Sequence, residues 1–197
     1  MIKKEVITGY ENLEIDIYQD ISLDQKKNLW FKSCLNDLNW EKGFIKIFGK
    51  THQIPRLQSW YADNGIEYTY SGKKLKRHNW NETLIEIKGE IEKITSFKFN
   101  SVLANLYRDE NDSMGLHSDN EKELGINPVI ASLSLGESRD LYFKHKNIKK
   151  SLNIPQKNGQ LIVMHGETQK YWKHEIKKTK KLKKPRINLT FRNIITD

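Results

Sequence analysis

The segment Arg186–Arg192 carries the side chains best suited to chemistry. A strand has a period of two, so alternate residues of this segment fall on opposite faces. One face is apolar, and the other face consists of Arg186, Asn188, Thr190 and Arg192. The two arginines lie about 20 Å apart along such a strand, at ~3.3 Å per residue. Because guanidinium groups pair strongly with carboxylates, this face predicts a site for a small dianion held lengthwise.

A second candidate set consists of His117 and Asp119, two residues apart, and the distant His174. In a strand or at its end, the side chains of His117 and Asp119 point the same way, and His174 fits a neighbouring strand. Two imidazoles and one carboxylate form the facial triad of non-haem iron oxygenases, which leaves three coordination positions for a cosubstrate and oxygen. The set predicts an iron site, and zinc is the alternative because it accepts the same donors.

Structural roles are the competing interpretation. A His-x-Asp pair is a weak signal by itself: His117 could be a turn histidine, and His174 a strand histidine satisfied by hydrogen bonds. His165 is the nearest rival ligand because it ends an apolar strand. The other histidines are His52, His78 and His145. The two arginines favour iron over zinc. A 2-oxo acid that chelates iron has a second carboxylate for an arginine to bind, whereas a zinc hydrolase has no need for two guanidinium groups.

Asn105 and Tyr107 also lie two residues apart, shortly before His117. On one face of a strand, an amide and a phenol could complete the binding site for the oxo acid. The alternative is that both are ordinary polar residues of a strand. Their position beside the candidate metal set makes them candidate cosubstrate ligands.

Two helices and a series of strands must position these side chains. Apolar residues recur at helical spacing from about residue 22 to 38 and from 82 to 93. After residue 97 the pattern is one of short strands separated by turns. Strands are expected at 13–18, 99–108, 129–135, 141–144, 161–165, 171–176 and 186–194. The fold class is therefore α+β, with a double-stranded β-helix (jelly-roll) core buttressed by two helices of the N-terminal half.

We expect one domain over residues 1–197, with an N-terminal strand and helix at 1–40 and the jelly-roll core at 97–194. The single cysteine, Cys34, excludes a disulfide framework and indicates a reducing compartment. Neither a signal peptide nor an apolar run of the ~20 residues that a membrane span needs is visible. A soluble monomer in the cytoplasm, or in the nucleus of a eukaryote, is the expectation.

The formal net charge of +9 favours a polyanionic partner, most simply nucleic acid. The alternative is a surface that is merely rich in lysine. Basic residues gather in three short segments, at 73–77, 144–150 and 177–184. Because these segments flank the candidate site residues, the clusters support a nucleic-acid partner over a solvated surface.

With these residues assembled, the chain resembles the AlkB family of Fe(II)/2-oxoglutarate dioxygenases over about residues 44–194. The resemblance rests on Asn105-Leu106-Tyr107, His117-Ser118-Asp119, His174 and the ordered Arg186-x-Asn188-x-Thr190-x-Arg192. Further similar segments are 55–61, 68–72 and 130–136. Together they look most like the branch that repairs alkylated DNA.

The resemblance implies a role for each matching position. His117, Asp119 and His174 would bind Fe(II). Arg192 and Asn105 would hold the metal-proximal carboxylate of 2-oxoglutarate, and Arg186 and Tyr107 the distal one, with support from Thr190 and Asn188. The residues that would surround the damaged base are Tyr68, Tyr70 and Ser71. Phe48 falls where some members that act on duplexes carry an intercalating residue.

The resemblance also implies an activity, the oxidative demethylation of 1-methyladenine and 3-methylcytosine in DNA, with RNA as a further substrate. Such a base must be flipped out of the duplex, at a cost of a few kcal/mol. Two alternatives remain open at this point. One is a related 2-oxoglutarate oxygenase that modifies RNA bases or a protein. The other is a catalytically silent nucleic-acid-binding domain.

Overall fold

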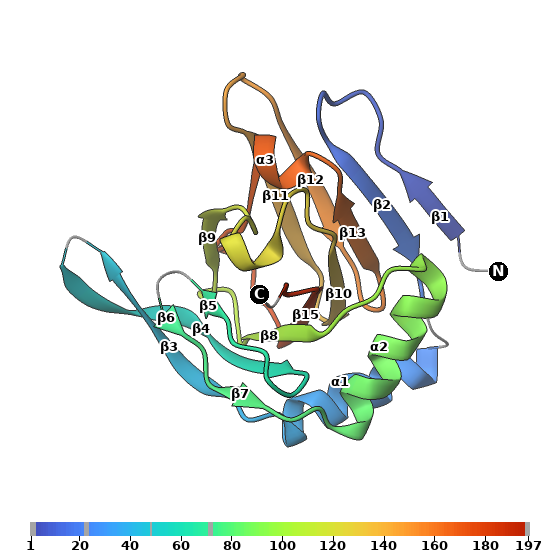
Figure 1. Ribbon diagram of the computed structural model, residues 1–197, viewed down its shortest axis with the longest axis vertical. Helices are drawn as coiled ribbons and strands as arrows, with labels where there is room; N and C mark the ends of the chain where they lie inside the picture. The colour runs from blue at the N-terminus through green and yellow to red at the C-terminus, as the bar shows by residue number, and fades with distance from the viewer. Residues whose placement is uncertain (1–2, 22–23, 48, 71–72, 196–197) are drawn as a thin grey trace.

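The segment Arg186–Arg192 forms a strand in the larger of two facing sheets. The computed structural model describes residues 3–21, 24–47, 49–70 and 73–195. The larger sheet contains β1 (Lys3–Val6), β2 (Glu14–Gln19), β3 (Glu41–Ile47), β4 (Lys50–Ala62), β7 (Arg77–His78), β8 (Ser101–Tyr107), β10 (Ile130–Gly136), β13 (Leu161–His165) and β15 (Arg186–Arg192). Within the described residues its order is β1-β2-β13-β10-β15-β8-β4-β3, with β7 parallel to β4 and the other pairs antiparallel (Figure 1).

The smaller sheet consists of β9 (Met114–His117), β11 (Arg139–His145), β12 (Ser151–Gln156) and β14 (Trp172–Ile176). It is antiparallel and has the order β12-β11-β14-β9. Two short strands, β5 (Thr69–Tyr70) and β6 (Lys73–Lys74), pair separately. Side chains of the larger and the smaller sheet meet in the space between them. For example, Arg186 of β15 donates a hydrogen bond to Gln156 of β12.

Two helices cover the outer face of the larger sheet, as the sequence predicted (Figure 1). They are α1 (Asp24–Asp37) and α2 (Glu82–Thr95). The side chain of Asn81 caps α2 by accepting a hydrogen bond from the amide of Leu84 at 2.9 Å. At its other end, Ser96 turns the chain with a φ of 62°. The apolar stripe of α2 is buried, so the expected period of this helix is confirmed.

The strand β15 lies in the centre of the larger sheet, between β10 and β8. Ile187, Leu189 and Phe191 pack into the hydrophobic core with the two helices. The four polar residues of β15 are buried as well, on the side that faces the smaller sheet. The predicted separation of the two faces is therefore confirmed, and burial of the polar face requires internal partners for it.

The strands expected after residue 97 are all present, but the sequence analysis missed several others. The strand β12 contains Pro155, which discourages a strand assignment, yet β12 is an edge strand where a proline is tolerated. The strand β9 is only four residues long and contains Gly115. The expected strand at 171–176 begins one residue later, because Thr168–Tyr171 forms the short helix α3.

The N-terminal segment belongs to the larger sheet. Its strand β2 pairs with β13, so Ile17 lies opposite Ile162 and Ile15 opposite Met164. Ile15 and Ile17 are buried in the space between the sheets. Across the described part of the chain, every helix is too short or too polar to cross a membrane.

Candidate functional site

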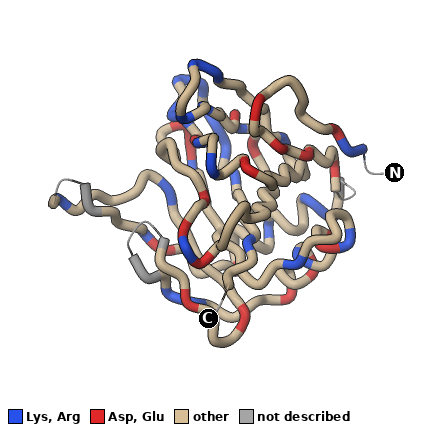
Figure 2. The backbone as a smooth tube through the Cα atoms, turned by 45° about the horizontal axis from the view of Figure 1, so that its top comes forward, with Lys and Arg blue, Asp and Glu red and all other residues tan. Residues whose placement is uncertain are grey.

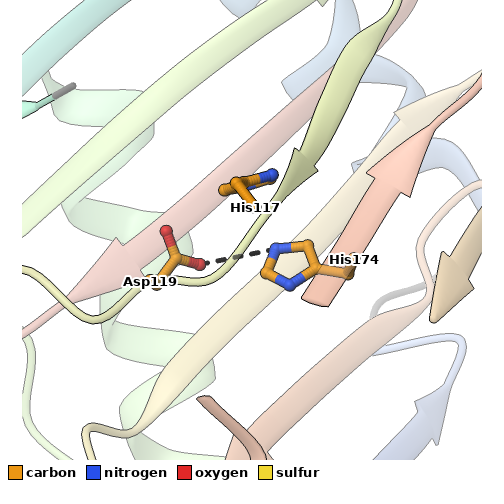
Figure 3. A group of neighbouring side chains, drawn as sticks. All are labelled: His117, Asp119 and His174. Atoms are coloured by element: carbon orange, nitrogen blue, oxygen red, sulfur yellow. Dashed lines mark ion pairs between the residues drawn. The ribbon is translucent and has the colours of Figure 1, made fainter. Parts of the chain in front are cut away.

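His117 and His174 lie opposite one another on neighbouring strands, His117 at the end of β9 and His174 in β14. Their ring centroids are 4.3 Å apart. Asp119 follows two residues after His117, in the loop beyond β9, and its carboxylate points toward both rings (Figure 3). One donor atom of each residue lies within 4.8 Å of the other two, and in the described ranges these residues form the only such group of three.

The carboxylate of Asp119 is almost completely buried, and its two oxygen atoms have different surroundings. Oδ1 accepts a hydrogen bond from Nη2 of Arg192 at 2.7 Å. Oδ2 lies 3.6 Å from Nε2 of His174 and has no hydrogen-bond partner among the described residues. Burial raises the pKa of Asp119, but Arg192 and the two histidines outweigh it and hold that pKa well below its usual range. An ionised oxygen without a donor, beside two imidazoles, fits a bound cation.

The two imidazoles are suited to bind a metal because they are neutral. Burial lowers the pKa of His174 to about 3, and burial also lowers the pKa of His117. Nδ1 of His117 lies 2.8 Å from the carbonyl oxygen of Gly115. Since a carbonyl can only accept, Nδ1 carries the proton and Nε2 presents its lone pair to a metal. Two neutral imidazoles and one carboxylate fit Fe(II).

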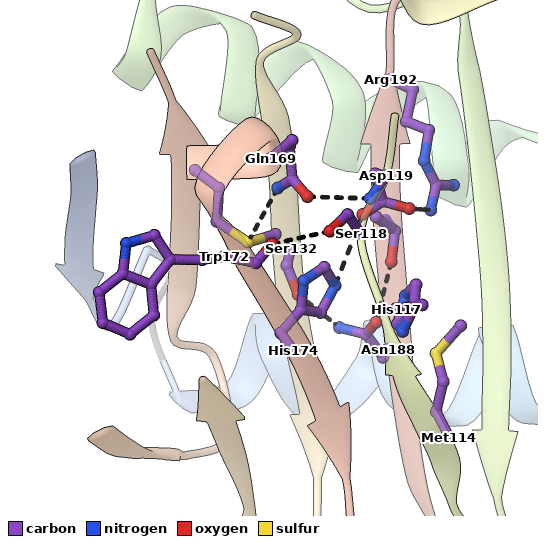
Figure 4. Close-up of polar contacts among 12 residues, drawn as sticks. Met114, His117, Ser118, Asp119, Ser132, Gln169, Trp172, His174, Asn188 and Arg192 are labelled. Carbon is purple, nitrogen blue, oxygen red and sulfur yellow. Dashed lines mark hydrogen bonds and ion pairs between the residues drawn. The ribbon is translucent and has the colours of Figure 1, made fainter. Parts of the chain in front are cut away.

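Two hydrogen bonds hold the loop that carries Asp119 (Figure 4). The backbone amide of Asp119 donates to Oε1 of Gln169 at 2.9 Å. The hydroxyl of Ser118 donates to the carbonyl oxygen of Trp172 at 2.7 Å. Gln169 belongs to α3 and Trp172 begins β14, so the segment just before His174 also positions Asp119.

A narrow cavity between the two sheets joins the histidines to both arginines. Its polar lining includes Tyr107, His117, Asp119, Gln156, His174, Arg186, Asn188, Thr190 and Arg192. Its volume is about 20 Å³, close to that of one water molecule. Side chains must therefore shift when an organic acid enters.

Arg186 lies at the end of this cavity that is away from Asp119 and is fully enclosed. Its Nε donates to Oγ of Ser134 at 2.8 Å, and its Nη2 donates to Oε1 of Gln156 at 2.6 Å. Its Nη1 forms no hydrogen bond with another described residue. Burial lowers the pKa of Arg186 to about 10, and Tyr107 opposes that shift, so the guanidinium stays charged at neutral pH. The arrangement leaves one cationic donor for an anion.

Two guanidinium groups lie close to the aromatic ring of Tyr107. The Cζ atoms of Arg186 and Arg139 are 5.2 Å and 5.7 Å from its centroid. Arg139 donates to the backbone carbonyls of Asp109, Asp112 and Lys177. Arg139 was not considered in the sequence analysis, and it lies beside Tyr107, which lines the cavity.

Asn188 and Thr190 form the wall between the two arginines. Nδ2 of Asn188 donates to Oγ of Ser132 at 2.8 Å, and the hydroxyl of Thr190 donates to Oδ1 of Asn188 at 2.9 Å. Asn105 lies opposite Asn188 in the sheet, but its Oδ1 accepts a hydrogen bond from Nε of Arg56 at 2.7 Å. Asn105 is thus engaged with a residue that the sequence analysis had not singled out.

A wider pocket of about 220 Å³ opens beside His117. It lies between the β3–β4 hairpin and β9, and its lining includes Phe44, Ile54, Arg56, Leu116 and His117. Phe44 and Leu116 are 44% and 37% exposed, so both apolar side chains are available to a ligand. The sequence analysis gave no role to Phe44, Arg56 or Leu116, because a single apolar or basic residue in a strand carries no signal by itself.

The residues expected around a base are only partly described. Tyr68 is 1% exposed, and it packs between Trp60 and the guanidinium of Arg192. Burial raises the pKa of Tyr68 above its usual range, and burial likewise raises the pKa of its neighbour Glu121. Tyr70 belongs to β5, but its side chain lies outside the described residues, as do Phe48 and Ser71.

The rival histidines lie in other surroundings. Nδ1 of His165 is 3.7 Å from Glu14, and its Nε2 is 3.5 Å from Asp16, on the strands β13 and β2. Nδ1 of His145 accepts hydrogen bonds from two backbone amides of the loop that follows it. His165 is therefore not part of the group around Asp119.

The charged residues are distributed over much of the molecule. Figure 2 shows basic and acidic positions interspersed along the tube, with basic residues grouped at the upper left of that view. Within the basic segment 177–184, Lys183 pairs with Glu137 at 3.1 Å, and Lys177 lies 3.5 Å from both a Glu175 oxygen and the Tyr142 ring centroid. Lys177 and Lys183 of this segment are thus held by contacts with other parts of the protein.

Comparisons with known proteins agree with this geometry. Residues 14–192 match the family described as the 2OG-Fe(II) oxygenase superfamily. The chain is 39% identical over 159 residues to the DNA oxidative demethylase ALKBH2 of Homo sapiens, which covers 77% of this chain and 61% of that protein. It is 40% identical over 186 residues to the alpha-ketoglutarate-dependent dioxygenase alkB homolog 3 of Homo sapiens, covering 89% and 64%.

The chain thus spans less than two thirds of the length of these two relatives. A solved structure of OsALKBH1 superposes with a TM-score of 0.64 at 14% sequence identity. That match covers 94% of this chain and 99% of the other. At this identity the likeness shows a shared fold.

Proposed function

Because the chain belongs to the AlkB family within the 2OG-Fe(II) oxygenase superfamily, we propose that it removes N-alkyl groups from nucleic-acid bases with Fe(II), 2-oxoglutarate and O₂. One observation carries the proposal. A single cavity is lined by His117, Asp119 and His174 at one end and by Arg186 with an unpartnered Nη1 at the other. This pairing of a metal triad with a buried cation fits a chelating dicarboxylic acid.

The finer assignment of the fold is part of the proposal. The facing antiparallel sheets, with β15 at the centre of one and β14 paired to β9 in the other, support a jelly-roll core. The pairing of β2 with β13 supports one domain over residues 1–197, in which the N-terminal strand is integral.

The residues have separate tasks in this proposal. His117, Asp119 and His174 would hold Fe(II), and Arg192 keeps Asp119 ionised and oriented. Arg186 and Tyr107 would receive the distal carboxylate of 2-oxoglutarate, and Arg192 with Asn105 would lie nearest its proximal end. Asn188 and Thr190 form the wall between these ends. When bound, iron, 2-oxoglutarate and O₂ together supply the oxidation of an N-methyl group to a hydroxymethyl group, which then leaves as formaldehyde.

The protein's own part is binding, orientation and exclusion of water. His117 lines both the wider pocket and the cavity that contains Asp119 and His174, so a base in the wider pocket would present its alkyl group to the metal. Phe44 and Leu116 offer apolar surface against which a planar base can pack. A base paired in a duplex cannot reach this depth and must be flipped.

Methylation at position 1 of adenine or position 3 of cytosine blocks base pairing and so lowers the cost of flipping. The net charge of +9 supports contacts to phosphates that are independent of sequence. DNA carrying these lesions is the proposed substrate, with methylated RNA as a second one. The same charge argues against a protein substrate.

The test is a demethylation assay on matched oligonucleotides. A DNA oligonucleotide with one 1-methyladenine should lose 14 mass units, as an exchange of CH₃ for H requires, and release formaldehyde in equal amount. Omission of Fe(II) or of 2-oxoglutarate, or the change His117→Ala, should stop both. Methylated RNA and a methylated peptide serve as competing substrates. If iron-loaded protein consumes no 2-oxoglutarate with any of these, the proposed function is wrong.

A further inference from the structure

The edge strand β12 contributes one side chain to which the proposed chemistry gives no task. Gln156 is the last residue of β12, has an exposed fraction of 0%, and lines the same cavity as Arg186. It reaches from the smaller sheet to Arg186 in the larger one. Its side chain therefore connects the two sheets at the end of the cavity away from Asp119.

The amide of Gln156 has a defined orientation. Its Nε2 donates to the carbonyl oxygen of Ser132 at 2.8 Å and lies 3.2 Å from the Ser132 hydroxyl. Because the carbonyl can only accept, Nε2 must face Ser132 and Oε1 must face Arg186. The Ser132 hydroxyl also accepts a hydrogen bond from Asn188. The orientation of Gln156 is thus coupled to the polar face of β15.

Two of the three donor groups of Arg186 are occupied by neutral partners. Nη2 of Arg186 donates to Oε1 of Gln156, and Nε of Arg186 donates to the hydroxyl oxygen of Ser134. Arg192, in contrast, has a carboxylate partner in Asp119 at 2.7 Å. A buried guanidinium that meets neutral partners keeps its charge available to an incoming anion. The neutral amide at position 156 thus permits anion binding at Nη1.

Building on the proposed function, we propose that Gln156 is a positioning residue for the cosubstrate. It holds Arg186 with Nη1 toward the cavity and leaves the guanidinium charge uncompensated. The cavity thereby favours a 2-oxo acid with a distal carboxylate over one that ends in a methyl group. A carboxylate at position 156 would itself pair with Arg186 and remove this preference.

The experiment measures binding without turnover, by calorimetry on protein loaded with Mn(II). The two ligands are 2-oxoglutarate and 2-oxopentanoate, which has the same chain length but a methyl group in place of the distal carboxylate. In Gln156→Glu, the dissociation constant of 2-oxoglutarate should rise by at least about tenfold, since a charge-assisted hydrogen bond is lost. That of 2-oxopentanoate should change less than about twofold, since it makes no such bond.

The matched control is Gln160→Glu. Gln160 is also buried, at 4% exposure, and it donates to Gln19 at 2.9 Å, on the β2 side of the molecule. The control adds the same charge without touching Arg186, so both dissociation constants should stay within about twofold of the parent, as expected for independent sites.

A second variant, Gln156→Met, keeps the volume and removes the acceptor without adding charge. It should weaken 2-oxoglutarate binding by about threefold or more, as loss of one oriented hydrogen bond does, and leave Mn(II) affinity unchanged. Thermal unfolding of each variant shows whether it is folded.

Three outcomes overturn the inference. Folded Gln156→Glu and Gln156→Met variants that bind 2-oxoglutarate like the parent would remove Gln156 from cosubstrate binding and leave the proposed function intact. Equal weakening of both ligands would make Gln156 merely structural. A parent protein that binds Mn(II) but no 2-oxoglutarate would refute the proposed function, and this inference with it.

Discussion

Nη2 of Arg192 lies 2.7 Å from Oδ1 of Asp119, and the two side chains are 3% and 1% exposed. The bond engages one oxygen of the carboxylate, while Oδ2 lies 3.6 Å from His174. Arg192, on the polar face of β15, therefore orients the carboxylate of Asp119 so that Oδ2 is on the side of His174. In the proposed site, this ion pair would belong both to the metal position, through Asp119, and to the cosubstrate position, through Arg192.

Removal of Arg192 should destabilise the whole protein. In Arg192→Met the carboxylate of Asp119 stays buried without its partner, so we expect the free energy of unfolding to fall by about 3–5 kcal/mol. Urea unfolding at neutral pH measures this loss. The control is Arg77→Met, because Arg77 is only half-buried and bonds Asn79 two residues away. An equal loss in both variants would contradict a special role for the buried pair.

Loss of one imidazole should abolish metal binding and leave the fold intact. His117 lies at the end of an edge strand, so His117→Ala removes little packing. We expect at least about a hundredfold loss in Mn(II) affinity, since changes around metal ligands already cost 10–100-fold. Calorimetry measures it, with His165→Ala as the control. Retained affinity in His117→Ala would exclude this triad as the metal site.

The pocket beside His117 should carry the affinity for the nucleic acid. Truncation of a side chain that stacks on a base costs about 1–3 kcal/mol, so Phe44→Ala should raise the KM for a methylated oligonucleotide by at least about fivefold. The KM for 2-oxoglutarate should not change, because Phe44 does not line the narrow cavity between the two sheets. Ile126→Ala is the control, since Ile126 is 94% exposed and lies elsewhere. Identical kinetics for the parent and Phe44→Ala would place the base in another pocket.

The lysines of segment 177–184 should act on phosphates and not on the cosubstrate. Replacement of Lys178, Lys180 and Lys181 by glutamine should flatten the dependence of binding on salt, by about 0.7–0.9 in slope for each phosphate that is no longer neutralised. Titrations of a fluorescent oligonucleotide at several salt concentrations measure the slope. The control replaces Lys93 and Lys98, at the end of α2 and just after it, by glutamine. A larger effect in the control would place the nucleic acid on another face.

Stability should respond to acid through Asp112. Burial raises the pKa of this carboxyl, but its hydrogen bonds with Arg108 outweigh burial and lower the pKa below its usual value. A lowered pKa in the folded state adds stability above the unfolded pKa of about 3.9, and this contribution is lost as pH falls through the folded value. Asp112→Asn should therefore be less stable than the parent at pH 7, and the difference should shrink below pH ~4. Urea unfolding across this range tests it, with the exposed Asp140→Asn as control; a constant difference would assign the loss to packing.

Part of the site could be predicted from the sequence because its residues occur in regular local patterns. The alternation along β15 predicted which face of the strand Arg186 and Arg192 share, since a period of two fixes it. The spacing of His117 and Asp119 predicted a common direction, although Asp119 lies in a loop and needs Gln169 to hold it. AlkB family membership, expected from these motifs, is confirmed.

Other parts of the site depend on contacts between distant segments. Gln156 meets Arg186 only because an edge strand with a proline closes against the larger sheet. Arg56 engages Asn105 across the pairing of β4 with β8. No local pattern around Gln156 or Arg56 contains this information, because such contacts are set by tertiary packing and not by periodicity.

The pairing of β2 with β13 also bears on how the chain folds. Residues 14–19 must meet residues 161–165, and β15 must then enter between β8 and β10. Closing loops of this length costs entropy before any contact compensates for it, so sheets of this connectivity fold slowly. During synthesis on the ribosome, the place of β15 between β8 and β10 stays empty until Arg192 has left the exit tunnel. From the synthesis of β8 and β10 until β15 emerges, the nascent chain would therefore expose unpaired edges of these two strands, the kind of surface that chaperones protect.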